Sequence, residues 1–196
     1  AVMTVGGWFD AEDLSGPLNI YKTIEKTSPK AKNTIVMGPF SHGGWGRETG
    51  KAFHNDIYFG DSIATYYQTK LETPFFNHYL KGNSKVDAGL PEATMYDTGK
   101  MEWKEFSVYP PKNAQKVSFY LADGTLKKAA SSSISEYYSD PNNPVLSSDN
   151  LKDFNGFTPR NYMSEDQRFA EGRPDVLTFT TDILTEDLTL TGEILA

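Results

Sequence analysis

The sequence of 196 residues contains no cysteine, which excludes disulfide bonds, thiolate catalysis and zinc sites built on cysteine ligands. It also lacks any apolar run as long as a membrane-spanning helix requires, and its mean hydropathy is -0.52. Basic residues are outnumbered, with 19 Lys and Arg against 26 Asp and Glu, and they form no dense cluster. We therefore expect neither a membrane span nor a nucleic-acid-binding surface.

Two segments near the amino terminus each combine a β-rich apolar run with a glycine-bearing turn, namely VMTVGGWFDAED and NTIVMGPFSHGGW. Asp10 follows the first turn and His42 follows the second, and a helix that Pro29 ends is predicted between them. A strand–helix–strand crossover brings both strand ends to the same edge of a sheet. An Asp and a His in this order, one βαβ unit apart, are typical of the last two members of a Ser–Asp–His triad. We therefore predict that Asp10 and His42 are a catalytic acid and base.

Each of these residues taken alone has a simpler explanation. Asp10 suits a turn and His42 suits a packed loop, so it is their joint placement after consecutive strands that favours the triad. His54 and His78 are the rival bases, but neither directly follows a predicted strand.

Glu12 and Asp13 place two more carboxylates directly after Asp10. One explanation is the acidity that a helix amino terminus favours, and the other is a negative pocket for a cationic group such as a substrate α-ammonium. No histidine lies at a useful ligand spacing, so we predict no metal site, and no motif indicates a cofactor. Among the aromatic residues that flank the two loops, Trp45 is the best candidate for a wall that faces the substrate.

The chain has no G-x-S-x-G motif, the sharp turn on which α/β-hydrolases carry their nucleophilic serine. It also starts and stops within β-like runs, AVMTV and LTLTGEILA. We therefore expect a segment of a longer protein whose serine lies upstream, and we expect the isolated chain to be inactive.

The pattern predicts two domains, α/β over residues 1–88 and all-β over residues 89–196. A second helix is expected over residues 61–81, with an irregularity at Pro74 and a cap at Gly82. From about residue 93 we expect an antiparallel, sandwich-like sheet that does not continue the parallel one, and residues 128–149 should form a long loop. The expected strands lie within residues 94–111, 116–126, 175–184 and 187–195.

Asp10 in GGWFDAED and His42 in GPFSHGG resemble the closing motifs of the X-prolyl dipeptidyl-peptidase, cocaine esterase and α-amino-acid ester hydrolase family. The glutaryl-cephalosporin acylase branch is the most similar, and FFNHYLKG and YMSEDQRFAEGRPDVLTFTT extend the resemblance over most of the chain. The resemblance implies the carboxy-terminal part of an α/β-hydrolase domain followed by a partial jelly-roll β-sandwich. It also implies that Asp10 is the triad acid and His42 the general base.

In the α-amino-acid ester hydrolases, a W-D-x-E-D motif supplies two further carboxylates that help to bind the substrate α-ammonium. Asp10, Glu12 and Asp13 keep the D-x-E-D spacing, although one aromatic residue is inserted after Trp8. Phe40 stands where many relatives have Trp, which changes a pocket wall mildly.

Three hypotheses follow. The first is a serine acylase or esterase that cleaves small ester or amide acyl groups, including α-amino acyl or β-lactam side chains. The second is an X-Pro dipeptidyl-peptidase, which shares the triad and needs an anionic pocket for its peptide substrate. The third is a stand-alone β-sandwich binding module, although no aromatic platform or calcium motif in residues 93–196 supports it. The oligomeric state stays open, as does the compartment, for which the resemblance favours a periplasmic or secreted bacterial enzyme.

Overall fold

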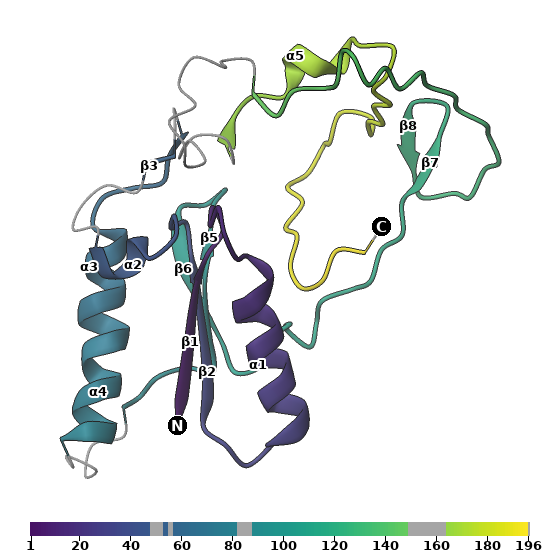
Figure 1. The fold of residues 1–196 in the computed structure, drawn as a ribbon. Coiled ribbons are helices and arrows are strands. Elements are labelled where there is room, and N and C mark those ends of the chain that lie inside the picture. Colours follow the sequence, from purple (N-terminus) through teal and green to yellow (C-terminus); the bar gives the residue numbers. More distant parts are fainter. Residues whose placement is uncertain (48–52, 55–56, 82–87, 149–163, 196) are drawn as a thin grey trace. The chain divides into compact units, whose positions relative to one another are not determined.

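A computed structural model of the chain describes residues 1–47, 53–54, 57–81, 88–148 and 164–195 (Figure 1). Its internal contacts divide it into two compact units, one holding the described residues up to Pro111 together with Ser164, and the other holding the rest. Among the described residues there is no helix with the length and apolar character to traverse a membrane.

The first unit is built on a mixed four-stranded sheet in the order β1-β2-β5-β6. Its strands are β1 (Val2–Gly7), β2 (Asn33–Gly38), β5 (Ala93–Asp97) and β6 (Glu102–Phe106). Strands β1, β2 and β5 run parallel, and β6 is antiparallel to β5. All six residues of β2 are buried, which explains why this strand has a nearly continuous apolar sequence rather than an alternating one.

Helices cover both faces of this sheet (Figure 1). The helix α1 (Ser15–Thr27) connects β1 to β2, as the sequence predicted, and its Tyr21 packs with Ile35 and Met37. On the other face, Val36 packs with Tyr67 and Leu71 of a second helical run. That run consists of α3 (Ile63–Tyr66), the π-helix η1 (Tyr67–Glu72) and α4 (Thr73–Leu80). The unit is therefore a three-layer α/β arrangement with β2 at its centre.

The helix expected over residues 61–81 is confirmed over residues 63–80. The irregularity expected at Pro74 takes the form of the π-helix, which ends just before Pro74 enters the first turn of α4. The Thr73 hydroxyl donates to the Gln68 carbonyl at 2.7 Å, as does the Thr73 backbone N–H. Because proline has no N–H and clashes with the preceding turn, the wider turn has a clear local cause. Gly82, the expected cap, lies outside the described residues.

Shorter elements follow β2 along the chain. They are the one-turn helix α2 (Gly44–Arg47) and the antiparallel pair formed by β3 (Phe53–His54) and β4 (Ile57–Tyr58).

The expectation that the parallel sheet ends before residue 93 was wrong. Strand β5 pairs in parallel with β2, with Ala93 opposite Ile35 and Met95 opposite Met37. Residues 93–96 are all buried, and burial on both faces is characteristic of a strand inside a parallel sheet. The alternation that suggested an antiparallel sandwich belongs to segments further along the chain. The domain limit predicted between residues 88 and 89 therefore falls inside the first compact unit, just ahead of β5.

In the described residues of the second unit, β7 (Tyr120–Ala122) and β8 (Thr125–Lys127) form an antiparallel hairpin, so the strand expected within residues 116–126 is confirmed. Its turn is Asp123–Gly124, and both residues have positive φ, 49° and 70°, as a tight hairpin turn requires. The described part of the expected loop, residues 128–148, has no helix or strand. The remaining helix is α5 (Arg168–Glu171).

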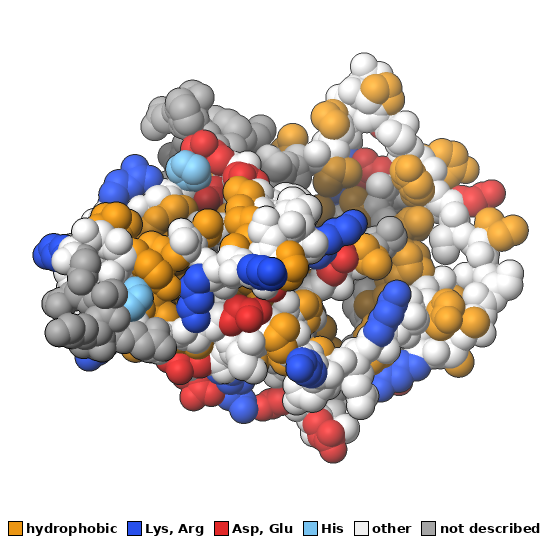
Figure 2. Space-filling model, turned by 90° about the horizontal axis from the view of Figure 1, so that it is seen from below, with side chains coloured by type: hydrophobic (Ala, Val, Ile, Leu, Met, Phe, Trp, Pro, Cys, Tyr) orange, Lys and Arg blue, Asp and Glu red, His pale blue; other side chains and the backbone are white. Residues whose placement is uncertain are grey.

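The strands expected within residues 175–184 and 187–195 were wrong. In these described segments the structure has only an isolated parallel bridge between Thr125 and Thr180. Strands are stabilised by pairing, and large apolar side chains here are open to solvent, with Ile183 95% and Ile194 78% exposed. Apolar side chains are also spread among charged ones over the face seen in Figure 2. The alternation of apolar and polar residues in these segments indicates a propensity for strand, but it does not show whether a neighbouring strand is present to pair with them.

Candidate active site

The loops that follow β1 and β2 leave the same edge of the sheet, and backbone hydrogen bonds link them to each other. The Trp8 N–H donates to the Gly38 carbonyl at 2.8 Å, and the Phe9 N–H donates to the Phe40 carbonyl at 3.1 Å. A Cβ on Gly7 would lie 2.2 Å from the Phe40 carbonyl oxygen, so this close approach requires glycine. The parallel pairing of β1 and β2 thus continues into both loops.

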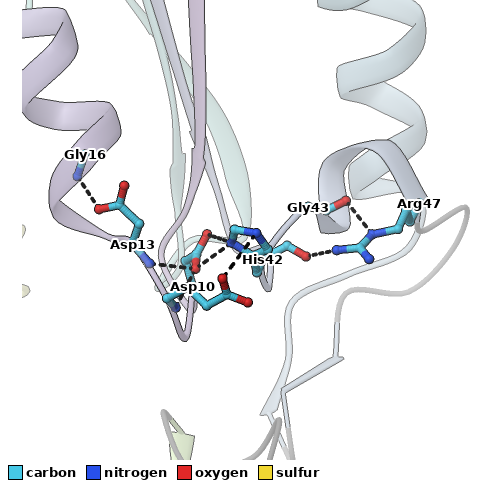
Figure 3. Close-up of polar contacts among 7 residues, drawn as sticks. Asp10, Asp13, Gly16, His42, Gly43 and Arg47 are labelled. Atoms are coloured by element: carbon cyan, nitrogen blue, oxygen red, sulfur yellow. Dashed lines mark hydrogen bonds and ion pairs between the residues drawn. The ribbon is translucent and has the colours of Figure 1, made fainter. Parts of the chain in front are cut away.

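Asp10 and His42 converge across this edge (Figure 3). His42 Nδ1 lies 3.1 Å from Oδ1 and 3.0 Å from Oδ2 of Asp10. The Asp10 side chain is 3% exposed, whereas that of His42 is 49% exposed. The prediction that these side chains meet at the carboxyl ends of adjacent parallel strands is confirmed. When Nδ1 donates to the carboxylate, Nε2 is the ring nitrogen that accepts a proton.

The Asp10 carboxylate is held by more than the imidazole. Its Oδ1 accepts the backbone N–H of Glu12 at 2.8 Å and that of Asp13 at 3.0 Å. Burial alone would raise the pKa of Asp10, but the N–H groups of Asp13 and Glu12 and the His42 ring together keep that pKa below its usual value. Asp10 therefore both forms a turn and faces the histidine as a carboxylate at neutral pH.

Glu12 and Asp13 point to different neighbours. Glu12 Oε2 lies 3.8 Å from His42 Nε2, and its side chain is 57% exposed. Asp13 Oδ1 instead accepts the Gly16 N–H at 2.6 Å, at the start of α1 (Figure 3). The structure thus brings Glu12 to the candidate base and Asp13 to the helix amino terminus, and the predicted substrate contacts of both stay predictions.

Trp45 lies in α2, where it is partly buried against the core of the first unit. Its ring meets Phe40 edge-on at a centroid distance of 6.3 Å, and its carbonyl accepts Gln68 Nε2 at 2.9 Å. Its proposed role as a substrate wall stays a prediction.

The other histidines lie on other elements. His78 is on α4, where its ring packs edge-on against Tyr79 at 4.5 Å. His54 is in β3, and its side chain lies outside what the structure describes. Within the described part of the chain, no group of three or more His, Asp or Glu residues is arranged to hold a metal ion.

Arg47 is a site residue that the sequence analysis missed. Its Nη2 donates to the His42 carbonyl, and its Nε donates to the Gly43 carbonyl at 3.3 Å. The available signal was a basic residue one short helical turn beyond the histidine loop, in GGWGR.

Comparison with known proteins adds a family context. Residues 84–196 match the family model of the X-Pro dipeptidyl-peptidase C-terminal non-catalytic domain. The chain is 28% identical over 215 residues to cocaine esterase from Rhodococcus sp. (strain MB1 Bresler), which covers 99% of this chain and 34% of the esterase.

Two solved structures are also similar. One is a selenomethionine-labelled α-amino acid ester hydrolase, with a TM-score of 0.77 and 30% identity, covering 94% of this chain and 31% of that one. The other is an aminopeptidase from the marine sediment archaeon Thaumarchaeota archaeon, with a TM-score of 0.74 and 29% identity, covering 89% of this chain and 29% of that one. The chain thus spans about a third of the length of these relatives.

Proposed function

Because this chain belongs to the X-Pro dipeptidyl-peptidase, cocaine esterase and α-amino-acid ester hydrolase family, we propose that it supplies the acid and the base of a serine hydrolase triad. The observation that carries the proposal is the Asp10–His42 hydrogen bond at the ends of two adjacent parallel strands. The nucleophilic serine would belong to the part of a longer parent protein that this chain does not span.

In the proposed reaction, His42 Nε2 takes the proton of the serine hydroxyl while the serine oxygen attacks the acyl carbonyl carbon. His42 then gives this proton to the leaving oxygen or nitrogen as its bond to the acyl carbon breaks, which produces an acyl-enzyme. A water molecule, deprotonated by the same nitrogen, then attacks the acyl carbon. His42 returns this proton to the serine oxygen as the bond between that oxygen and the acyl carbon breaks, which releases the acid and restores the serine. Asp10 holds the Nδ1 proton and stabilises the imidazolium that forms in each half of the cycle.

We assign the mixed sheet and its helices to the carboxy-terminal part of an α/β-hydrolase domain. Residues 89–196 would then contribute to a jelly-roll β-sandwich in the parent protein. The family match from residue 84 onward supports a boundary near residue 89, although β5 and β6 add to the first sheet.

The proposed substrates are small esters or amides whose acyl part carries an α-ammonium group. The support is the Glu12 carboxylate, which lies 3.8 Å from the nitrogen that would face the substrate. A charge-assisted hydrogen bond between the Glu12 carboxylate and the substrate ammonium would contribute about 1.5–3 kcal/mol to binding, and the partial exposure of Glu12 argues for the lower end. Asp13 would act alongside it, more indirectly, through the start of α1.

Release of X-Pro dipeptides from the amino termini of peptides is a second candidate function. The family match and the archaeal aminopeptidase favour it, because a peptidase acting at a free amino terminus also has to recognise an ammonium group. The leaving group distinguishes the two functions, since one releases an alcohol or a small amine and the other a peptide.

The test uses the full-length parent protein with phenylglycine methyl ester, phenylacetic acid methyl ester and Ala-Pro-p-nitroanilide. Substituting His42→Ala or Asp10→Asn should lower kcat by at least about 100-fold on whichever substrates are cleaved. His78→Ala is the matched control and should change kcat little, because its ring packs on α4. Full activity of His42→Ala would refute the triad, and the preferred substrate would decide between ester hydrolase and peptidase.

Glu12 is tested with Glu12→Gln on the first two esters. If it binds the ammonium, kcat/KM should fall about 10-fold or more for phenylglycine methyl ester and much less for the ester without the amino group. Equal losses on both esters would show that Glu12 supports the loop rather than the substrate.

A further inference from the structure

The loop that carries His42 is tight, yet the ring itself has little packing around it. Gly43 has a φ of +66°, and the Gly44 N–H donates to the Ser41 carbonyl at 2.9 Å, which turns the chain directly into α2. The His42 side chain is half exposed, at 49%. Packing therefore constrains this imidazole weakly, so its direction depends on its contact with Asp10 and on how its own backbone is held.

Arg47 holds that backbone at two successive peptide groups. Its Nη2 reaches the His42 carbonyl and its Nε reaches the Gly43 carbonyl at 3.3 Å (Figure 3). A guanidinium is planar, always charged and rich in donors, so it can hold two carbonyls in a fixed geometry. A lysine at this position has a single ammonium and cannot present the same fork.

Gly43 makes room for this contact. A Cβ on Gly43 would lie 2.5 Å from Arg47 Nη2 and 3.1 Å from Arg47 Cζ and Nε. The positive φ favours glycine here, and a larger side chain would displace the guanidinium, so the arrangement depends on two residues at once.

A second contact anchors α2 without touching the His42 peptide. Gln68 Nε2, in the π-helix, donates to the Trp45 carbonyl at 2.9 Å. Loss of this bond would loosen α2 but leave both Arg47 contacts in place, which makes Gln68 a suitable comparison.

We propose that Arg47 is a positioning residue that fixes the His42 backbone so that Nδ1 meets the Asp10 carboxylate and Nε2 faces the reacting groups. The catalytic part of this inference rests on the proposed function, whereas the hydrogen bond between His42 and Asp10 can be measured without any activity.

The first experiment is proton NMR of the chain itself, in which a strongly hydrogen-bonded imidazole N–H gives a resonance far downfield. Its disappearance in His42→Ala assigns it to the His42–Asp10 pair. In Arg47→Ala this resonance should broaden or vanish, while the backbone amide signals show that the first unit is still folded. In Arg47→Lys the resonance should be retained only in part. In Gln68→Met it should persist.

The second experiment adds guanidinium chloride at low millimolar concentration to Arg47→Ala, because the exposed side chain leaves an accessible site. The resonance should return with guanidinium but not with sodium chloride at equal ionic strength. Lys30→Ala, which removes one positive charge from the turn before β2, should behave like the unaltered chain.

In the full-length parent, Arg47→Ala should lower kcat about 10-fold to 100-fold with little change in KM, since a displaced base slows chemistry more than binding. An unchanged resonance in Arg47→Ala, or none in the unaltered chain, would overturn the positioning role whatever the parent's activity. If Arg47→Ala loses the resonance but keeps an undiminished kcat, Arg47 does position His42, and the catalytic role of that positioning is rejected.

Discussion

Replacing Asp10 with Asn tests whether the negative charge of the carboxylate, rather than the shape of the side chain alone, holds the two loops together. Asn keeps an acceptor oxygen for the N–H groups of Glu12 and Asp13, which lie 2.8 and 3.0 Å from Oδ1. It removes the negative charge, however, and turns an NH2 group toward His42 Nδ1, so that this nitrogen has to accept a hydrogen bond and the ring takes the other tautomer. The substitution thus replaces one charged hydrogen bond by a neutral one and weakens two others.

The size of the effect follows from those three contacts. Hydrogen bonds to a charged partner contribute about 1.5–3 kcal/mol each, against about 0.5–1.5 kcal/mol for neutral pairs. The Asp10 side chain is 3% exposed, so solvent screens these contacts little. Because contributions of neighbouring bonds do not add fully, we expect Asp10→Asn to lower the free energy of unfolding at pH 7 by about 2 kcal/mol.

The effect should depend on pH with a definite sign. The pKa of Asp10 is lowered in the folded state, so the carboxylate stabilises the fold above its unfolded pKa of about 3.9. This stabilisation is lost as the pH falls through the lowered folded pKa, when the folded protein takes up the proton. The difference between the two proteins should therefore be full at pH 7 and shrink below about pH 4.

Urea unfolding followed by tryptophan fluorescence measures the difference in the free energy of unfolding between Asp10→Asn and the unaltered chain, and it reports on the first compact unit. The chain has 3 tryptophans, and Trp8, Trp45 and Trp103 all belong to the first unit. Glu105→Gln, which removes an exposed carboxylate from the edge strand β6, is the control and should change stability little. Equal stabilities at pH 7, or a difference that grows as the pH falls below about 4, would refute the reasoning.

Two other substitutions test the packing around the site. Gly7→Ala should destabilise the first unit by about 1–3 kcal/mol in urea, because its Cβ would meet the Phe40 carbonyl oxygen at 2.2 Å; unaltered stability would mean that the loops do not approach so closely. Thr94→Val should be neutral or stabilising by about 1–2 kcal/mol in the same assay. The reason is that Thr94 is fully buried and its hydroxyl has no hydrogen-bond partner among the described residues, so a clear destabilisation would reveal a bond to that hydroxyl.

The contact between Asp10 and His42 was predictable because its determinants are local. Asp10 and His42 each follow a strand with a strong apolar run, and a single helix joins the strands, so the handedness and direction of the crossover fix the two ends. The continuous burial of β2 is likewise visible in its sequence. Periodicity and turn residues were sufficient for this part of the fold.

Non-local pairing decided what the sequence analysis missed. Whether β5 joins β2 depends on the helices that bury both of its faces, which no feature of ATMYD reveals alone. The apolar alternation over residues 187–195 predicted a strand, but alternation does not provide a partner. Arg47 was missed because its contacts are with backbone carbonyl groups, and every residue has one, so the sequence does not mark the two that it binds.

The backbone bonds that join the two loops beyond the ends of their strands have a consequence for motion. Since the Trp8 and Phe9 N–H groups are bonded to Gly38 and Phe40, neither loop can detach without breaking the same bonds. Local unfolding in proteins proceeds in such cooperative pieces, so these two amides should exchange with deuterium together and slowly. The loops that carry Asp10 and His42 would then open and close together. A state in which only one of the two loops is folded would be rare.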